Sequence, residues 1–372
     1  MSVSDQKTLY ILKFAPFPQF LRFGGKSLYF RLNSEDRESG ARLAETWELS
    51  GHPKHSSIVV NGALKGRTLT ELCALYGCDL LGPGLCVDEA NPFPIMLRFL
   101  DCRENLPPAV HPDDEYCKAY GLIEGGKTEA WYIIEADPGA VVYCGAKPGL
   151  THNRILALSR NGLIFEHLKT YPTSSGDVFL VPSRRPHSIG AGNLVYEIQQ
   201  TSNAIFPFDW LDWADKDEER RQSDLGHSVG IVDLEPGKPD KIQPLTIATG
   251  PNKHQLLTLC RYFCLEKFEL TESRPLPEWE SGFVILTCLK GRVGLSSTTA
   301  PDEEVFIGFG ETALVPACRR PVTIRPVGAS LVLAAWAPRD IPRLRDRLAA
   351  EGYKAGAVSQ LGGYGPFNTL LQ

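Results

Sequence analysis

The chain has 372 residues, of which 43% are hydrophobic and 22% charged, and its formal net charge is −5. This composition excludes a largely disordered chain, and the length favours two or three domains. The negative charge argues against a nucleic-acid partner, because neutralising phosphates requires a basic face. No apolar run reaches the roughly 20 residues of a membrane helix, and the first residues lack the pattern of a signal peptide. We therefore expect no membrane partner and a cytoplasmic protein.

Ten cysteines are spread along the chain without a CxxC pair. The two closest, Cys260 and Cys264, lie in LTLCRYFCLEKFEL, whose composition is typical of a β-strand. Their even number therefore gives no support for a disulfide framework. We expect reduced thiols, in keeping with a cytoplasmic chain.

Short β-strands dominate the predicted elements. Runs of four to seven residues, such as AWYIIEA, AVVYCGA, DVFLVPS and LVYEIQQ, are bounded by Gly, Pro or Asp. This pattern is typical of antiparallel sandwiches and barrels. Helical periodicity is clearest in LTELCALYG, which Gly77 ends, in residues 153–169, and in PRLRDRLAAEGY, which Gly352 ends. We predict a mainly β protein with a few inserted helices.

The two halves of the chain share a weak internal repeat. TEAWYIIEADPGAVVYCG is followed by SGDVFLVPSRRPHSIGAGNLVYEIQ, and ESGFVILTCLKGRVGLSS is followed by GFGETALVPACRRPVTIRPVGASLVLAAW. Each copy indicates strand, turn, strand, a hairpin containing Val-Pro, and two more strands. We therefore predict two β-barrels or jelly rolls of one design. The second copy has Val322 where the first has His187, which predicts a metal site in only one of them.

The predicted domains follow from this repeat. We expect an N-terminal metal-binding barrel with a helical insert, then a polar, Pro-rich connecting segment, then a second barrel without metal ligands, and finally a C-terminal helix and tail. Their predicted ranges are 1–202, 203–256, 257–337 and 338–372.

Two histidines and one carboxylate are the candidate metal ligands. His111 lies in NLPPAVHPDDEY, Glu129 in EGGKTEAWYII and His187 in VPSRRPHSIGAG. Two imidazoles and a carboxylate suit Zn²⁺ and leave positions open for water or substrate, and strands can direct all three side chains into a barrel. Spacing alone leaves an alternative open, in which the histidines are hydrogen-bonded turn residues and Glu129 is an ordinary strand carboxylate.

Two neighbouring motifs have structural interpretations. Asp113 and Asp114 follow His111 in HPDDEY, where we expect them to satisfy free N–H groups at the start of a helix. His52 and His55 in GHPKH suggest a second metal site, but we interpret the segment as a loop.

Seven ordered segments carry a resemblance to a known family: ETWELSGHP, SIVVNGALKGRTLTEL, PFPIMLRFLDCRENL, VHPDDEY, GGKTEAWYIIEADPGA, GDVFLVP and HSIGAGNLVYEIQQTS. Together they resemble the short bacterial form of type I mannose-6-phosphate isomerase over roughly residues 20–210, and the second barrel matches it loosely. The resemblance implies a bicupin fold, one zinc ion, and interconversion of an aldose phosphate and a ketose phosphate through a cis-enediol. It also implies that His111, Glu129 and His187 bind the metal. Lys127, which is retained, would add positive charge near the developing oxyanion or take part in proton transfer.

The chain departs from the family pattern at four positions. The glutamine ligand of the family is Ala109 here, and its phosphate-linked serine is Pro107. An acidic residue with a proposed acid/base role is Asn203, and an active-site arginine is Pro207. Three protein ligands suffice for a catalytic zinc, but an amide is not a base and proline does not bind phosphate.

Arg184 and Arg185 stand just before His187 and are candidates to bind substrate in place of the lost charge; the alternative is that they are solvated hairpin residues. We predict a metal-dependent aldose–ketose isomerase that acts on mannose 6-phosphate or a related sugar, with Zn²⁺ as its expected cofactor. The alternative is a non-catalytic, sugar-binding or regulatory bicupin that keeps the metal. The expected partner is a small sugar or sugar phosphate, and self-association is left open.

Overall fold

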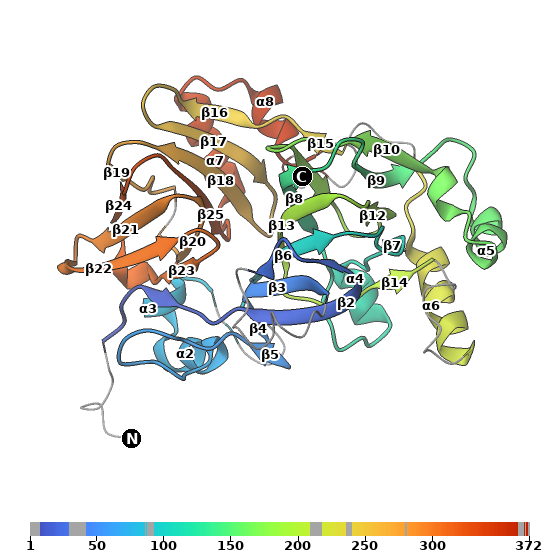
Figure 1. The fold of residues 1–372 in the computed structure, drawn as a ribbon, viewed down its shortest axis with the longest axis horizontal. Helices are drawn as coiled ribbons and strands as arrows, with labels where there is room; N and C mark the ends of the chain where they lie inside the picture. Colours follow the sequence, from blue (N-terminus) through green and yellow to red (C-terminus); the bar gives the residue numbers. More distant parts are fainter. Residues whose placement is uncertain are drawn as a thin grey trace.

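The structure, a computed structural model, describes residues 8–29, 42–85, 87, 93–208, 218–235, 240–279, 281–363, 368 and 370. Antiparallel strands dominate, and each half of the chain is built around a larger and a smaller sheet (Figure 1). The predicted mainly β fold is confirmed. Among the described residues no sheet closes on itself, so each half is a sandwich of two sheets rather than the closed barrel that we also considered.

The first half packs a larger sheet against a smaller one. The larger sheet has the order β15 (Lys241–Ile242), β11 (Val178–Val181), β8 (Glu129–Ala136), β13 (Asn193–Gln200), β6 (Ile95–Cys102), β3 (Leu43–Leu49) and β2 (Phe17–Gly25). The smaller sheet has the order β10 (Leu168–Pro172), β9 (Val141–Ala146), β12 (His187–Ile189), β7 (Ala109–Val110) and β14 (Phe206–Pro207). Buried side chains from both sheets, including Trp131 and Val142, form one cluster between them.

The second half repeats this design. Its larger sheet has the order β1 (Leu12–Lys13), β23 (Thr312–Val315), β20 (Val284–Lys290), β25 (Ser330–Trp336), β18 (Cys264–Leu270), β17 (Lys253–Leu259) and β16 (Leu245–Ala248). Its smaller sheet has the order β19 (Arg274–Pro275), β24 (Val322–Pro326), β21 (Arg292–Ser297) and β22 (Ala300–Gly308). The order β11–β8–β13–β6 thus matches β23–β20–β25–β18, which confirms the internal repeat.

Two strands cross between the halves. β1, near the start of the chain, pairs with β23 through Leu12 and Leu314, and so extends the larger sheet of the second half. β15 pairs with β11 in the first half. The predicted connecting segment 203–256 therefore supplies strands to both halves: β14 and β15 to the first, and β16 to the second. The predicted domain ranges themselves stay a prediction.

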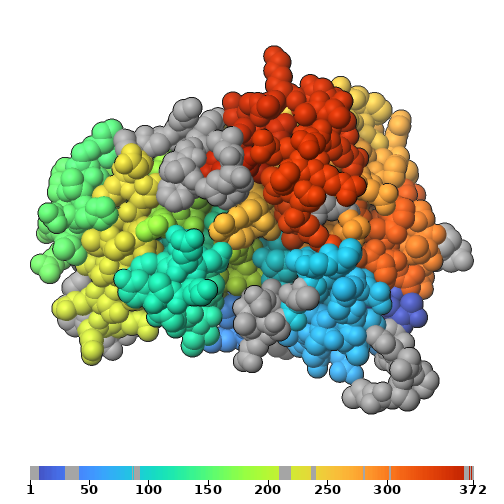
Figure 2. Space-filling model, turned by 180° about the vertical axis from the view of Figure 1, so that it is seen from behind, coloured from blue at the N-terminus to red at the C-terminus, as the bar shows by residue number. Residues whose placement is uncertain are grey.

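The helices lie outside the sheets (Figure 1). They are α2 (Leu69–Tyr76), α3 (Cys78–Leu81), α4 (Asp114–Ala119), α5 (His152–Arg160), α6 (Glu218–Ile231), α7 (Ile341–Ala350) and α8 (Ala355–Gln360), with 3-10 turns at Ile164–His167 and Ala317–Arg319. The C-terminal segment that carries α7 and α8 covers one face of the second half (Figure 2). A separate two-stranded sheet lies at the edge of the first half. It is the hairpin of β4 (Gly51–His52) and β5 (His55–Ser56).

Local sequence signals explain several of these helix ends. Thr68 and Glu71 form a reciprocal capping box at the start of α2, and Gly77 ends the helix at φ 46°. Asp113 caps α4 by accepting a hydrogen bond from the backbone N–H of Tyr116, as HPDDEY predicts. α5 and the following 3-10 turn occupy the segment 153–169, where we expected helical structure.

The segment LTLCRYFCLEKFEL is not the single strand that its composition suggests. It is a hairpin, because β17 ends at Leu259 and β18 begins at Cys264. None of the nine cysteines among the described residues is assigned to a disulfide, and Cys86 lies outside these residues. None of the helices in the described part of the chain combines the length and the apolar character that crossing a membrane requires.

Candidate metal centre

The three predicted metal ligands come together inside the first half. His111 directly follows β7, Glu129 begins β8 and His187 begins β12. Their ligand atoms lie within 4.8 Å of one another, and the three residues are at most 6% exposed. Residues on three separate strands therefore form one buried His–Glu–His cluster.

Hydrogen bonds orient both imidazole rings. The Nδ1 atom of His111 lies 2.8 Å from the carbonyl oxygen of Ala204, and Nδ1 of His187 lies 2.7 Å from that of Arg185. A carbonyl oxygen only accepts, so each Nδ1 carries the proton and each Nε2 is left with a lone pair. Metal-binding histidines are commonly held in this way.

The distances within the cluster fit a bound metal ion. Nε2 of His111 lies 3.1 Å from Oε2 of Glu129, and Nε2 of His187 lies 3.5 Å from Oε1. With metal–ligand bonds of about 2.0–2.2 Å, tetrahedral geometry places neighbouring ligand atoms about 3.3 Å apart. Oε2 of Glu129 is also buried and has no hydrogen bond of acceptable geometry. Apart from an ion pair with Lys127 and the contact with His111, this oxygen has no partner among the described residues, and the donor set fits one divalent ion.

The protonation states suit metal binding as well. Burial lowers the pKa of His111 to about 3, and the charge of Lys127 acts in the same direction. Burial also lowers the pKa of His187. For Glu129 burial acts to raise the pKa, but the charge of Lys127 and the contact with His111 outweigh it and hold the pKa well below its usual value. Neutral imidazoles and an ionised carboxylate are the forms that ligate a metal.

Lys127 lies beside the cluster. Its Nζ atom is 3.1 Å from Oε2 of Glu129, and the residue is 5% exposed. Its backbone N–H donates to the carbonyl oxygen of Pro112, which fixes the chain immediately before β8. The structure therefore places the predicted catalytic lysine in direct contact with the predicted metal carboxylate.

The cluster forms one end of a cavity of about 280 Å³. Next to the cluster, on the same sheet as Glu129, the lining carries a buried charge network that the sequence interpretation missed. Arg98 on β6 donates to Glu197 on β13, with an Nε–Oε1 distance of 2.8 Å, and to Glu45 on β3, with an Nη1–Oε2 distance of 3.0 Å. Burial disfavours the charged guanidinium, but Glu197 and Glu45 outweigh it and raise the pKa of Arg98. The indole of Trp131 links this network to Glu129, 3.1 Å from its Oε1.

Three of the four positions that depart from the family pattern line the same cavity. These are Pro107, Ala109 and Asn203. Pro207 is not among the described lining residues; it lies on β14, paired with Ala109. The cavity wall therefore has a methyl group, a proline ring and an amide where the resemblance implies a metal ligand, a phosphate-linked hydroxyl and an acid.

The two predicted substrate-binding arginines, Arg184 and Arg185, make their contacts outside this cavity. Arg185 is 5% exposed, and its guanidinium makes two hydrogen bonds of 3.0 Å to Asp240 and an ion pair of 3.4 Å with Asp233. Arg184 is part-exposed and lies 3.4 Å from Asp113. Neither is among the described residues that line the cavity. Their role in substrate binding stays a prediction, and the contacts of Arg185 are those of a structural residue.

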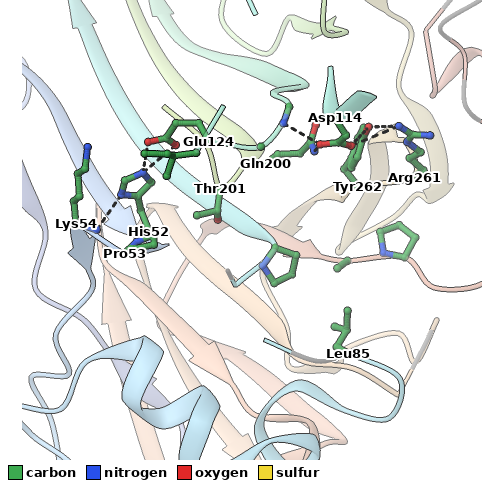
Figure 3. A pocket seen from close by; sticks show the side chains of 16 residues that line it. His52, Pro53, Lys54, Leu85, Asp114, Glu124, Gln200, Thr201, Arg261 and Tyr262 are labelled. Atoms are coloured by element: carbon green, nitrogen blue, oxygen red, sulfur yellow. Dashed lines mark hydrogen bonds and ion pairs between the residues drawn. The ribbon is translucent and has the colours of Figure 1, made fainter. Parts of the chain in front are cut away.

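A larger pocket, of about 490 Å³, lies between the two halves (Figure 3). On one wall His52 lies 3.1 Å from both carboxylate oxygens of Glu124, and its Nδ1 accepts a hydrogen bond from the N–H of Lys54. On the other wall Tyr262 donates to Asp114 at 2.9 Å. Among the described residues, His111, Glu129 and His187 form the only cluster of three or more such side chains with metal-binding spacing. We therefore take the smaller cavity as the candidate site because of its metal-binding side chains and not because of its size.

Residues that line the pocket between the halves help to position the candidate metal centre. Glu124 accepts a hydrogen bond from the backbone N–H of Asn203 at 3.0 Å, and Ser202 donates to the carbonyl oxygen of Gly125 at 2.7 Å. The next residue, Ala204, accepts the hydrogen bond that orients His111. The His52–Glu124 pair thus helps to fix the segment that positions the predicted metal ligand His111.

Comparison with known proteins identifies the family. The model of the catalytic domain of type I phosphomannose isomerase matches residues 24–137. A curated mannose-6-phosphate isomerase of Streptococcus mutans is 31% identical over 277 residues, which are 73% of this chain and 82% of that protein. The chain belongs to the type I phosphomannose isomerase family. A second relative in the family, mannose-6-phosphate isomerase ManA of Bacillus subtilis, is 30% identical over 67% of this chain and 77% of that protein.

Solved structures of phosphomannose isomerases have the same fold. The crystal structure of the mannose 6-phosphate isomerase from Bacillus subtilis superimposes with a TM-score of 0.73 at 25% identity, covering 87% of this chain and 99% of the other. A zinc-bound mannose 6-phosphate isomerase superimposes with a TM-score of 0.69 at 15% identity, covering 88% and 100%. The cupin fold that the resemblance implied is thereby confirmed.

Proposed function

We propose that the chain is a divalent-metal-dependent aldose–ketose isomerase, with the metal held by His111, Glu129 and His187. The observation that carries this proposal is the buried, pre-oriented His–Glu–His cluster beside a cavity in a member of the phosphomannose isomerase family. We expect Zn²⁺, because two imidazoles and one carboxylate with open positions are a common catalytic zinc set.

Aldose–ketose isomerisation moves one proton between adjacent carbons and one between their oxygens, through an enediolate. A bound divalent metal would polarise these oxygens. The histidines supply neutral nitrogen ligands and Glu129 supplies a charged one, while their burial excludes water from the site. Lys127 supplies a second positive charge at this end of the cavity, where the developing oxyanion would lie. The relatives named above are mannose-6-phosphate isomerases, which is why we assign this reaction class.

Aldose–ketose interconversion should be measured on the zinc-loaded protein with free and phosphorylated mannose. Turnover should disappear when a chelator removes the metal and return when Zn²⁺ is added. Lys127→Met should lower kcat by about 10²–10³, the usual effect of removing a group that stabilises a developing oxyanion. Lys118→Met, on the exposed surface of α4, is the matched control and should change nothing. Turnover that a chelator does not affect, or none with either sugar, would contradict the proposal.

A further inference from the structure

The charge of the cavity indicates which class of sugar it accepts. We propose that the substrate is an uncharged monosaccharide rather than a sugar phosphate. This inference rests on the proposed function, because it concerns the substrate of the same cavity. It follows from three features of the described lining residues: how the cations are paired, how the charges balance, and what forms the mouth of the cavity.

The two cationic side chains in the described lining, Arg98 and Lys127, are already paired with carboxylates. The guanidinium of Arg98 makes hydrogen bonds to Glu45, Glu197 and Gln199 through all three of its nitrogens. Lys127 lies against Glu129 at 3.1 Å. A buried phosphate requires an arginine fork or another cation as its own partner. Arg98 would have to leave buried carboxylates to provide one, and the proposed function already assigns the charge of Lys127 to the developing oxyanion.

The balance of charge disfavours a dianion. The described lining contains three carboxylates, those of Glu45, Glu129 and Glu197, against two cations. One net negative charge therefore remains, and a divalent metal ion would convert it to one net positive charge. A single positive charge matches the single negative charge of an enediolate formed from a neutral sugar. A phosphate dianion would neutralise that positive charge before the reaction begins. It would leave one net negative charge in a buried site.

The mouth of the cavity is apolar. Leu21 and Ile205 are each 43% exposed, and Leu106 and Pro107 also line the cavity. Such side chains contact the C–H groups of a sugar ring and offer nothing to a phosphate. The amides of Gln19 and Asn203 also line the cavity; each both donates and accepts hydrogen bonds, as hydroxyl groups require. A volume of about 280 Å³ lies just below the usual range of ligand pockets, about 300–1,000 Å³, and suits one sugar ring.

Calorimetric binding and kcat/KM should be measured on the zinc-loaded protein with mannose and with mannose 6-phosphate. Mannose should bind at least tenfold more tightly and, if turnover occurs, should have the higher kcat/KM. Tighter binding of mannose without turnover would support this inference while the proposed function fails. Tighter binding of mannose 6-phosphate, or binding of neither sugar, would overturn the inference.

A variant at the mouth tests the physical cause. Ile205→Arg adds a cation at an exposed position, so the fold should tolerate it. It should shift the ratio of the two affinities toward mannose 6-phosphate by at least tenfold, and added salt should reduce the shift. Ile205→Gln adds a polar side chain of similar length without charge and should leave the ratio as it is. An equal shift in both variants, or none in Ile205→Arg, would contradict the assignment of substrate preference to charge.

Discussion

The two halves of the molecule share a strand order but differ in what their interiors contain. In the first half Glu129 begins β8 opposite Val181; in the second half Val284 occupies the same register on β20, opposite Val315. His187 at the start of β12 corresponds to Val322 at the start of β24. Two of the proposed metal ligands in one half are therefore valines in the other.

The second half has nevertheless kept buried polar groups. Glu266 on β18 accepts hydrogen bonds from the indoles of Trp279 and Trp336 at 2.9 and 2.6 Å, and lies 2.6 Å from Nε2 of His254. These contacts satisfy both carboxylate oxygens within a packed core. The same sheet architecture thus holds an open, charged cavity in one half and, in the other, a closed network in which both oxygens of Glu266 are satisfied. The comparison shows that the fold positions side chains, while a few strand residues decide whether a reactive site exists.

The largest expected effect comes from substituting Glu129. Its counterpart in the second half, Val284, is substituted for comparison. Glu129→Gln removes the charged metal ligand and should lower kcat/KM at least about a thousandfold, since metal polarisation is worth several kcal/mol and about 1.4 kcal/mol is a factor of ten. Val284→Ala should lower stability by about 1–3 kcal/mol and leave the metal content unchanged. Steady-state kinetics and metal analysis check both. If the two variants had equal effects on turnover, the halves would not differ as proposed.

The Arg-Arg-Pro hairpins of the two halves offer a second comparison. Arg185→Met leaves Asp240 buried without its cation and should cost about 3–5 kcal/mol of unfolding free energy. Arg320 in the second half donates to the carbonyl oxygens of Pro277 and Gly282, so Arg320→Met should cost only about 1–3 kcal/mol. Urea unfolding measures both values. A stable Arg185→Met protein with a raised KM would instead support the substrate-binding role that the sequence suggested.

The closed network of the second half should matter for stability alone. In Glu266→Gln the new amide N–H groups would face an indole or imidazole donor, so we expect a loss of about 2 kcal/mol, the usual cost of unsatisfied buried groups. Metal content and kcat/KM should not change. Loss of bound metal in this variant would show that the second half takes part in the site.

Within one pH unit below 6.5, the smallest effect that we predict is a dependence of stability on pH. In the metal-free protein His111 is held neutral, with its pKa lowered from 6.5 to about 3. Between these values the unfolded chain binds the proton and the folded chain does not, so the unfolding free energy falls as the pH is lowered below 6.5. The slope for one such group is at most about 1.4 kcal/mol per pH unit. His111→Asn should flatten the curve; an unchanged slope would contradict the burial argument.

Much of the fold could be predicted from the sequence, because its signals are local. Short apolar runs between turn residues indicated the strands, and the repeated Val-Pro hairpins indicated two similar halves. The pairing of β1 with β23 could not be predicted in this way, since Leu12 and Leu314 meet only in the folded chain. The hairpin within LTLCRYFC was missed because Cys260 to Phe263 lack the Gly or Asn that usually marks a turn.

The site was predictable only in part. The ligand set was implied by the resemblance, whereas spacing left an ordinary structural role open for each residue. The cavity network was missed, although Arg98 within IMLRFL is a charge at the centre of an apolar strand. Its partners Glu45 and Glu197 lie on strands 53 and 99 residues away. The contact of Arg185 with Asp240 was missed for a similar reason, because Asp240 lies 55 residues further along the chain.

The most direct test is an equilibrium titration of the metal-free protein with Zn²⁺, followed by calorimetry. We predict one ion bound per chain, with affinity reduced at least a hundredfold in Glu129→Gln and in His187→Ala, and unaltered in Val322→Ala. The absence of Zn²⁺ binding, or equal binding by the first two variants and the unmodified protein, would contradict the assignment of the metal centre to His111, Glu129 and His187.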